Sequence, residues 1–164
     1  MFRTPHSTAF RRFCAYEAEC RGTLGSMERQ KEHLLKVLFI LIWVIALIHM
    51  AAENFYLYWT YRWFDIFTHF LGGMWVGLAG IWLWYFSGYI REMHLPSKRA
   101  VLVALGVGIS IGIVWEVFEF VVWQLTGNGL PINYIPDTAL DLVVDAIGAL
   151  AGFGLFQFFR RKID

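Results

Sequence analysis

Four stretches of apolar residues, separated by short polar connections, dominate the pattern along the chain. They cover roughly residues 34–52, 64–86, 100–125 and 138–159. A helix needs about 20 residues to cross a bilayer, and each stretch is long enough. The composition, with 58% hydrophobic and only 16% charged residues, is that of a membrane protein. We therefore expect an all-α integral membrane protein whose domain, residues 34–159, is a bundle of four transmembrane helices.

The first apolar stretch follows a basic segment, as the apolar part of a signal peptide does. It is longer than such a part usually is and lacks a convincing cleavage site, so we expect it to be retained. Residues 1–33 are polar and without clear periodicity, and we interpret them as an irregular cytoplasmic segment. Either the first 26 residues form a small surface appendage, or the chain starts at Met27, which opens a complete lead-in to the first helix.

The distribution of Lys and Arg predicts the orientation in the membrane. These residues gather before the first helix, between the second and third helices, and in the tail of residues 160–164. The other two connections contain only Arg62. Because basic loops stay on the cytoplasmic side, both termini are predicted to be cytoplasmic. We expect a multi-pass protein of the plasma (inner) membrane, with the other two connections outside.

Acidic residues are concentrated on the predicted outer side, together with two histidines. Seven of the thirteen acids lie there: Glu53, Asp65, Glu116, Glu119, Asp137, Asp141 and Asp145, with His49 and His69. Within a helix these residues are three or four positions apart, so they share one face. The four helices are therefore predicted to direct carboxylates and imidazoles at one zone of the bundle.

Pairs of glycines continue the polar faces on three helices. They are Gly73 and Gly77, Gly108 and Gly112, and Gly148 and Gly152. Small residues at this spacing let membrane helices approach closely, although one such pair alone is a weak signal. Their coincidence with the polar faces predicts that these faces meet in the bundle interior, with a wider polar chamber toward the outside.

Carboxylates in this zone need a compensating positive charge, because a charged side chain near the bilayer centre costs about 2.5–3.5 kcal/mol on insertion scales. Either several acids are protonated or one or two divalent cations are bound. Carboxylates suit Mg²⁺, Mn²⁺ or Ca²⁺, and added histidine suits Zn²⁺ or Fe²⁺. We expect Mg²⁺, Mn²⁺ or Zn²⁺. The candidate ligands are Asp65, His69, Glu116, Glu119, Asp137, Asp141 and Asp145, with His49 and Glu53 as their outer partners.

Simpler roles are open to some of these residues. Asp137 is placed to cap the fourth helix, which is compatible with binding a metal. An interfacial position is enough to explain Asp65 and Glu53. Three acids lie a turn or more inside an apolar stretch and resist that explanation: Glu116, Asp141 and Asp145. A histidine in an apolar helix is usually satisfied by a hydrogen bond, which we favour for His49; His69 shares the face of Asp65, and we favour a functional role for it.

Three motifs carry a resemblance to known membrane proteins. The segments "FDIFTHFLGG" (64–73), "VWEVFEF" (114–120) and "PDTALDLVVDAIGA" (136–149) resemble the YjdF-like family of small bacterial and archaeal membrane proteins, and more loosely the VanZ-like proteins. The likeness covers roughly residues 45–155. It implies a bundle of four or five helices with polar positions at Asp65, His69, Glu116, Glu119, Asp137 and Asp141, whereas Asp145 matches only some members. The YjdF-like family has no established reaction, and VanZ-like proteins are associated with glycopeptide resistance and so with the cell envelope.

Three classes of function fit this pattern. The first is a metal-dependent hydrolase or transferase acting on a lipid-linked envelope substrate, with Glu116 or Glu119 as the catalytic base. The second is a carrier for a metal ion or proton, and the third is a structural or binding protein with protonated acids. The cytoplasmic halves of the four apolar stretches contain no Asp, Glu or His, which disfavours a carrier. We therefore favour the enzyme.

The partners follow from the same features. The bilayer surrounds the bundle, a lipid-linked substrate is expected, and the glycine faces are suited to self-association. There is no basic face for nucleic acid and no nucleotide-binding loop. The uncharged segment 126–136, rich in Gly and Pro, lies over the predicted site. It is either a lid or entrance, or simply a connector.

Overall fold

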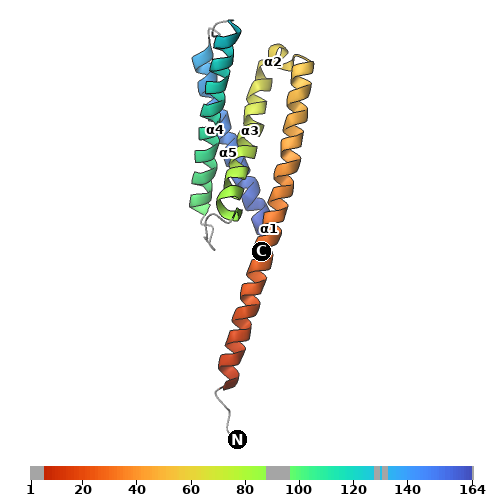
Figure 1. Cartoon of the computed structure of the whole chain (residues 1–164), viewed down its shortest axis with the longest axis vertical. Coiled ribbons are helices and arrows are strands. Elements are labelled where there is room, and N and C mark those ends of the chain that lie inside the picture. The colour runs from red at the N-terminus through yellow and green to blue at the C-terminus, as the bar shows by residue number, and fades with distance from the viewer. Residues whose placement is uncertain (1–5, 88–96, 128–129, 131–132, 164) are drawn as a thin grey trace.

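The computed structural model describes residues 6–87, 97–127, 130 and 133–163, and the elements in them are helices (Figure 1). They are α1 (His6–Asn54), α2 (Leu57–Thr60), α3 (Arg62–Phe86), α4 (Ser97–Thr126) and α5 (Tyr134–Ile163). Four segments are long and apolar enough to cross a membrane: Glu28–Asn54, Arg62–Phe86, Ser97–Thr126 and Tyr134–Arg160. The expected all-α bundle of four transmembrane helices is confirmed. The cytoplasmic location of both termini stays a prediction.

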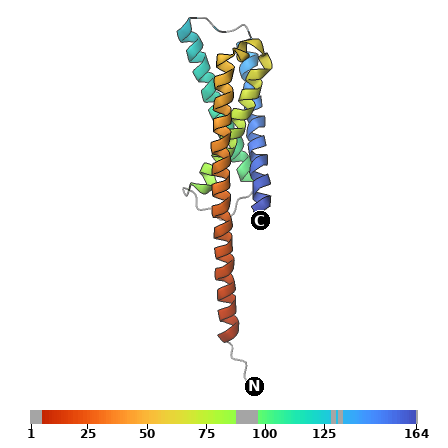
Figure 2. The ribbon, with the colours of Figure 1, turned by 90° about the vertical axis from the view of Figure 1, so that its right-hand side faces the viewer.

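The N-terminal segment differs from our expectation. We predicted an irregular structure for residues 1–33. Residues 1–5 lie outside the described residues, and residues 6–33 belong to α1, which continues without interruption from His6 into the first membrane span. Its N-terminal half projects beyond the other helices in both views (Figures 1 and 2). The reason is local, because residues 6–33 contain no proline and many good helix formers such as Ala, Arg and Glu. Absence of hydrophobic periodicity therefore did not mean absence of a helix.

Helix α3 is the centre of the bundle. It contacts α1, α4 and α5, and its contact with α5 is the most extensive in the described part of the molecule. Four glycines lie in the α3–α5 contact: Gly73, Gly77, Gly148 and Gly152. An added Cβ on Gly73 would collide with the backbone of Asp145, and one on Gly148 with the backbone of Phe70. The prediction that the glycine faces form the bundle interior is confirmed.

The half of the bundle near the C-terminus has an apolar core. Its buried side chains are Leu34, Leu38, Leu78, Ile81, Tyr85, Phe86, Ala100, Ala104 and Phe156. Two tryptophans of α3 attach α1 to this core: Trp75 Nε1 donates to the carbonyl of Leu38 at 2.9 Å, and Trp82 Nε1 to that of Lys31 at 3.2 Å. Because an indole N–H has no water to bond in hydrocarbon, these bonds fix α1 against α3.

The opposite end of the bundle, which we call the α2 end, carries the short helix α2 between α1 and α3 (Figure 1). Tyr56 adopts a left-handed conformation, with φ of 55°, directly before α2. Such a conformation is uncommon for a residue other than glycine and marks a sharp change of chain direction. Aromatic rings from α2 and the start of α3 contact one another here, including Tyr58 with Phe64. The turn brings these side chains beside the polar residues of α3.

Candidate functional site: an acidic cluster around His69

Six acids and one histidine from three helices gather at the α2 end, and we call them the acidic cluster. They are Asp65 and His69 of α3, Glu116 and Glu119 of α4, and Asp137, Asp141 and Asp145 of α5. Asp141 lies within electrostatic range of His69 and Glu116. Glu119 lies within electrostatic range of Asp65 and His69. The three helices thus direct the residues that the spacing singled out toward one region.

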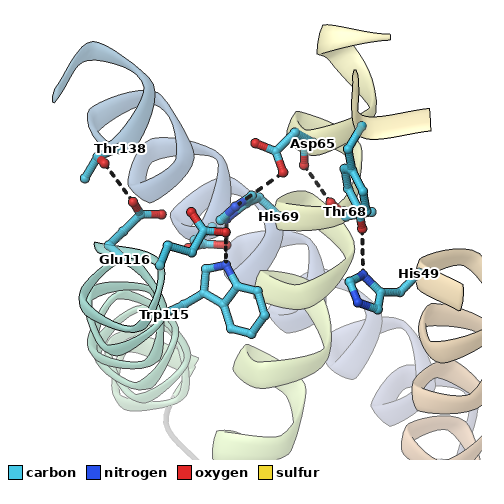
Figure 3. A network of polar contacts seen from close by, with 10 residues as sticks. His49, Asp65, Thr68, His69, Trp115, Glu116 and Thr138 are labelled. Carbon is cyan, nitrogen blue, oxygen red and sulfur yellow. Dashed lines mark hydrogen bonds and ion pairs between the residues drawn. The ribbon is translucent and has the colours of Figure 1, made fainter. Parts of the chain in front are cut away.

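His69 lies at the centre of the acidic cluster and is only 8% exposed. Its Nδ1 atom is 3.4 Å from Asp145 Oδ1, and its Nε2 atom is 3.9 Å from Asp65 Oδ1. Asp65 is one turn before His69 on α3, whereas Asp145 comes from α5 and is itself buried. Figure 3 shows the imidazole below Asp65, facing α4. The ring is therefore positioned between two carboxylates from different helices.

Three residues of the acidic cluster lie close enough together to be able to hold a metal ion. One ligand atom each from Asp65, His69 and Asp141 lies within 4.8 Å of the other two. His69 and Asp141 are buried, and Asp65 is partly exposed. Two carboxylates and an imidazole are ligands for Zn²⁺, Mn²⁺ or Fe²⁺ in proteins. Small movements of side chains would bring the three atoms to one ion.

Glycines make room for the Asp145 carboxylate. A Cβ added to Gly112 of α4 would collide with Asp145 Oδ2, and one added to Gly73 of α3 would collide with the Asp145 backbone. Asp145 therefore occupies a space that both neighbouring helices leave open by lacking a side chain. This packing fixes the carboxylate on the Nδ1 side of His69.

Glu116 is buried at the α4–α5 contact, with 6% of its surface exposed. Thr138 Oγ1 donates to Glu116 Oε2 at 2.7 Å (Figure 3). The Tyr134 hydroxyl donates to the Glu116 backbone carbonyl at 3.1 Å. The other carboxylate oxygen, Oε1, is buried and has no hydrogen-bond partner among the described residues. A buried acceptor without a partner costs about 1–3 kcal/mol.

Glu119 and Asp137 lie nearer the surface of the acidic cluster. Trp115 Nε1 donates to Glu119 Oε1 at 3.0 Å, which holds a partly exposed carboxylate in place. Asp137 is exposed, and the prediction that it caps the fourth helix is wrong. Because α5 begins at Tyr134, the Asp137 backbone N–H already bonds to the carbonyl of Asn133 at 3.1 Å. Its charge still lies favourably in the first turn of the helix.

The two expected outer partners, His49 and Glu53, are both exposed on α1. His49 Nδ1 lies 2.8 Å from the Tyr58 hydroxyl of α2, in line with the hydrogen-bonded role that we favoured for it. Burial raises the pKa of Tyr58, and the nearby charges of Asp65 and Glu53 raise it further. The phenol therefore keeps its proton at neutral pH and can donate it to His49.

Four polar side chains of this region were not identified from the sequence: Tyr58, Trp115, Tyr134 and Thr138. All four carry an O–H or N–H group. A search restricted to acids and histidines passes over such groups, and aromatic residues near an interface are common in any membrane protein. Thr138 had one usable signal, because it lies three residues before Asp141 and so on the same helix face.

A groove between α4 and α5 adjoins the acidic cluster. It has a volume of about 270 Å³, and its lining is Ile113, Glu116, Val117, Phe120, Tyr134, Thr138 and Leu142. This mainly apolar lining differs from the polar chamber that we expected. Residues 128, 129, 131 and 132 of the segment over the site lie outside the described residues, so its role as a lid or entrance stays a prediction.

Comparison with known proteins identifies a family but no function. A model of the family described as "Predicted membrane protein (DUF2238)" matches residues 26–162. No curated protein and no solved structure matches the chain. The match includes all four membrane-spanning segments and the whole acidic cluster. The chain therefore belongs to the DUF2238 family of predicted membrane proteins.

Proposed function

We propose that the protein binds a divalent metal ion through Asp65, His69 and Asp141 and acts as a hydrolase or transferase on a lipid-linked envelope substrate. The observation that carries the proposal is the distance of at most 4.8 Å among one ligand atom from each of these residues. These three candidate ligands come from α3 and α5, and two of the three are buried. A buried carboxylate needs a compensating charge, and a divalent cation supplies it.

Asp145 has a different role in this proposal from the one we expected. It lies on the Nδ1 side of His69, which leaves Nε2 directed toward Asp65. Metal-binding histidines commonly donate their second ring N–H to a carboxylate, which fixes the orientation of the ring. Asp145 therefore orients His69 rather than binding the metal. Of the six remaining candidate ligands, two carboxylates and one imidazole bind the ion in this proposal. The other three, Glu116, Glu119 and Asp137, surround them.

A bound divalent cation would lower the pKa of a water molecule and so supply a nucleophile. The proton of that water needs an acceptor, and α4 offers two carboxylates. Glu119 is partly exposed and lies within electrostatic range of His69. Glu116 is buried and already accepts a hydrogen bond from Thr138. Glu119 is the better catalytic base, because its position allows it to exchange protons with solvent.

The location of the polar residues supports an enzyme rather than a carrier. In the described part of the chain, the buried charged or polar side chains are His69, Glu116, Asp141 and Asp145, all at the α2 end. The other half is an apolar core around Phe156 and Leu78. An ion crossing the bundle would have to pass this core, in which none of the buried side chains that the structure describes is charged. The resemblance to VanZ-like proteins supports an envelope substrate.

The first test is the metal content of detergent-purified protein, measured by mass spectrometry after exposure to Mg²⁺, Mn²⁺ and Zn²⁺. We expect close to one ion per chain in the wild type and in Glu32→Gln, which removes an exposed carboxylate of α1 remote from the cluster. Asp141→Asn should lose the ion. Wild-type protein that retains no metal would contradict the proposal. The remaining interpretation would then be that the acids are protonated and therefore neutral.

The second test concerns the reaction. Purified protein would be incubated with lipid phosphates and lipid-linked pyrophosphates, and phosphate release would be measured. We expect Glu119→Gln to keep its metal but to lower kcat by about 10²- to 10⁴-fold, the usual contribution of a general base. Asp141→Asn should lose both metal and activity. Equal activity in Glu119→Gln and the wild type would remove Glu119 from the mechanism.

A further inference from the structure

The groove between α4 and α5 faces the lipid phase and contains few polar groups. On its α4 side, Ile113, Val117 and Phe120 are 48%, 57% and 41% exposed. Apolar side chains exposed on a membrane-spanning helix contact lipid, so the groove opens into the bilayer. An apolar pocket with a few convergent polar groups is the usual form of a binding site for a small molecule. Here those groups are Glu116, Tyr134 and Thr138.

The polar groups of the groove leave one acceptor unused. Both hydroxyls are directed at Glu116: Thr138 donates to Oε2 and Tyr134 to the backbone carbonyl. Glu116 lines the groove and is only 6% exposed, and its Oε1 atom is buried without a partner among the described residues. The terminal torsion of a glutamate is soft, so the carboxylate can turn an oxygen toward a ligand in the groove. A ligand that fits the groove should therefore carry a hydrogen-bond donor.

The charges around the groove decide which donor fits. None of its seven lining residues is cationic. Glu116 and Asp137 both lie within electrostatic range of Asp141, so the groove adjoins several carboxylates. With no metal ion bound to offset these carboxylates, they would repel a lipid with a purely anionic head, whereas an ammonium group offers both the donor and the opposite charge. We propose that the groove binds the primary ammonium head of a membrane lipid such as phosphatidylethanolamine, with the Glu116 carboxylate as its acceptor.

The polar groups of the groove lie near the start of α5, and its size agrees with this ligand. Thr138 lies four residues after the start of α5 at Tyr134, which is about 6 Å at a rise of 1.5 Å per residue. Its partner Glu116 is therefore about one helix turn below the start of α5, on a helix that continues ten residues further to Thr126. A volume of about 270 Å³ holds the head group and leaves the acyl chains outside, against the exposed apolar residues of α4. The proposal rests on the proposed function in treating this lipid as a candidate substrate, but its binding needs no metal.

The test is native mass spectrometry of detergent-released protein titrated with three lipids that have identical acyl chains. Phosphatidylethanolamine has a primary ammonium group with N–H donors. Phosphatidylcholine has a positively charged nitrogen without an N–H donor, and phosphatidic acid has neither a positive charge nor an N–H donor. Ile113→Trp would fill the groove, and Ile111→Trp is its matched control, because both isoleucines are 48% exposed on α4 and only Ile113 lines the groove. Glu116→Gln removes the charge with little change in size.

We expect one phosphatidylethanolamine to bind the wild type and Ile111→Trp. Binding should be weaker by about tenfold or more in Ile113→Trp and in Glu116→Gln, as the loss of a hydrogen bond to a charged group predicts. Phosphatidylcholine and phosphatidic acid should bind the wild type as weakly as phosphatidylethanolamine binds these two variants. Equal binding of phosphatidylcholine, or unchanged binding in Ile113→Trp, would overturn the proposal. So would a dimer that Ile113→Trp dissociates, which would assign the groove to a second copy of the chain. Metal content of the same samples is measured separately, so failure of the metal site and failure of the lipid site are distinguishable.

Discussion

At the scale of single residues, the arrangement of the acidic cluster depends on the specific contacts of each side chain and not on charge alone. His69 lies between Asp65 and Asp145, and Glu116 accepts a hydrogen bond from Thr138. A buried polar group without a partner is costly, so each contact determines which atoms remain available for a ligand. The acids are therefore not equivalent. Some hold neighbouring side chains in position, whereas others have oxygen atoms left for an ion.

Asp145→Asn tests the orienting role of Asp145. The substitution keeps the size of the side chain but removes the charge beside His69 Nδ1. We expect metal affinity to fall by about 10- to 100-fold, the usual effect of losing such a partner, in a titration of purified protein with Zn²⁺. Asp137→Asn is the control, because it removes an exposed carboxylate from the same helix. Equal losses in both variants would indicate a general effect of charge and contradict the specific role.

Thr138→Val tests the hydrogen bond to Glu116. Valine has nearly the same shape as threonine, but it leaves both oxygens of a buried carboxylate without a donor from any residue that the structure describes. We expect the free energy of unfolding in detergent to fall by about 1–3 kcal/mol. Thr126→Val is the control, because the Thr126 hydroxyl bonds only to exposed carbonyls of its own helix among the described residues. If both variants unfold alike, the Thr138 bond does not stabilise the bundle.

At the scale of the helices, the glycine contacts decide where the polar residues meet. Lipid tails are as apolar as the side chains of the helices, so packing and not hydrophobic burial holds membrane helices together. Gly73 of α3 and Gly148 of α5 allow close backbone approach between the two helices. His69 is one turn before Gly73, and Asp145 is three residues before Gly148. The close contact therefore brings these two polar side chains to the same level.

Gly73→Ala and Gly72→Ala form a matched pair that tests this contact. A Cβ at Gly73 would collide with the Asp145 backbone, whereas a Cβ at Gly72 has no atom within 4 Å. We expect Gly73→Ala to unfold more easily and to lose metal, because α3 and α5 must move apart. Gly72→Ala should be as stable as the wild type or more stable by about 0.5–1 kcal/mol, since alanine favours a helix. Thermal unfolding in detergent measures both, and equal stability of the two variants would contradict the role of the contact.

At the scale of the whole molecule, the bundle has two different halves. The α2 end contains the acidic cluster, and the other half contains the apolar core to which α1 is attached by Trp75 and Trp82. The N-terminal half of α1 projects beyond this second half (Figure 2). A site confined to one end is accessible from one side of the membrane. This arrangement supports our proposal of a reaction at the membrane surface over transport across the membrane.

The predicted orientation can be tested with a membrane-impermeant maleimide on intact cells. Cys14 and Cys20 precede the first span and are expected on the cytoplasmic side, so they should react only after the membrane is permeabilised. A cysteine introduced at Trp59, which is 67% exposed in α2, should react in intact cells when the two native cysteines are replaced by serine. Reaction of Cys14 and Cys20 in intact cells would reverse the orientation and place the acidic cluster on the cytoplasmic side.

The sequence by itself determined the four membrane spans, because the length of an apolar stretch is a local property that the bilayer thickness imposes. It also identified the polar face of each helix, since residues three or four apart must lie on one side of a helix. Only the tertiary structure decided the pairings among helices. It placed Asp145 beside His69, Thr138 beside Glu116 and a groove between α4 and α5. Such contacts depend on how closely and at what level two helices pack, which no single helix specifies. The helical structure of residues 6–33 is also a local property, and it follows from the helix propensity of these residues. Hydrophobic periodicity indicates only which face of a helix packs against a partner, so it did not predict this helix.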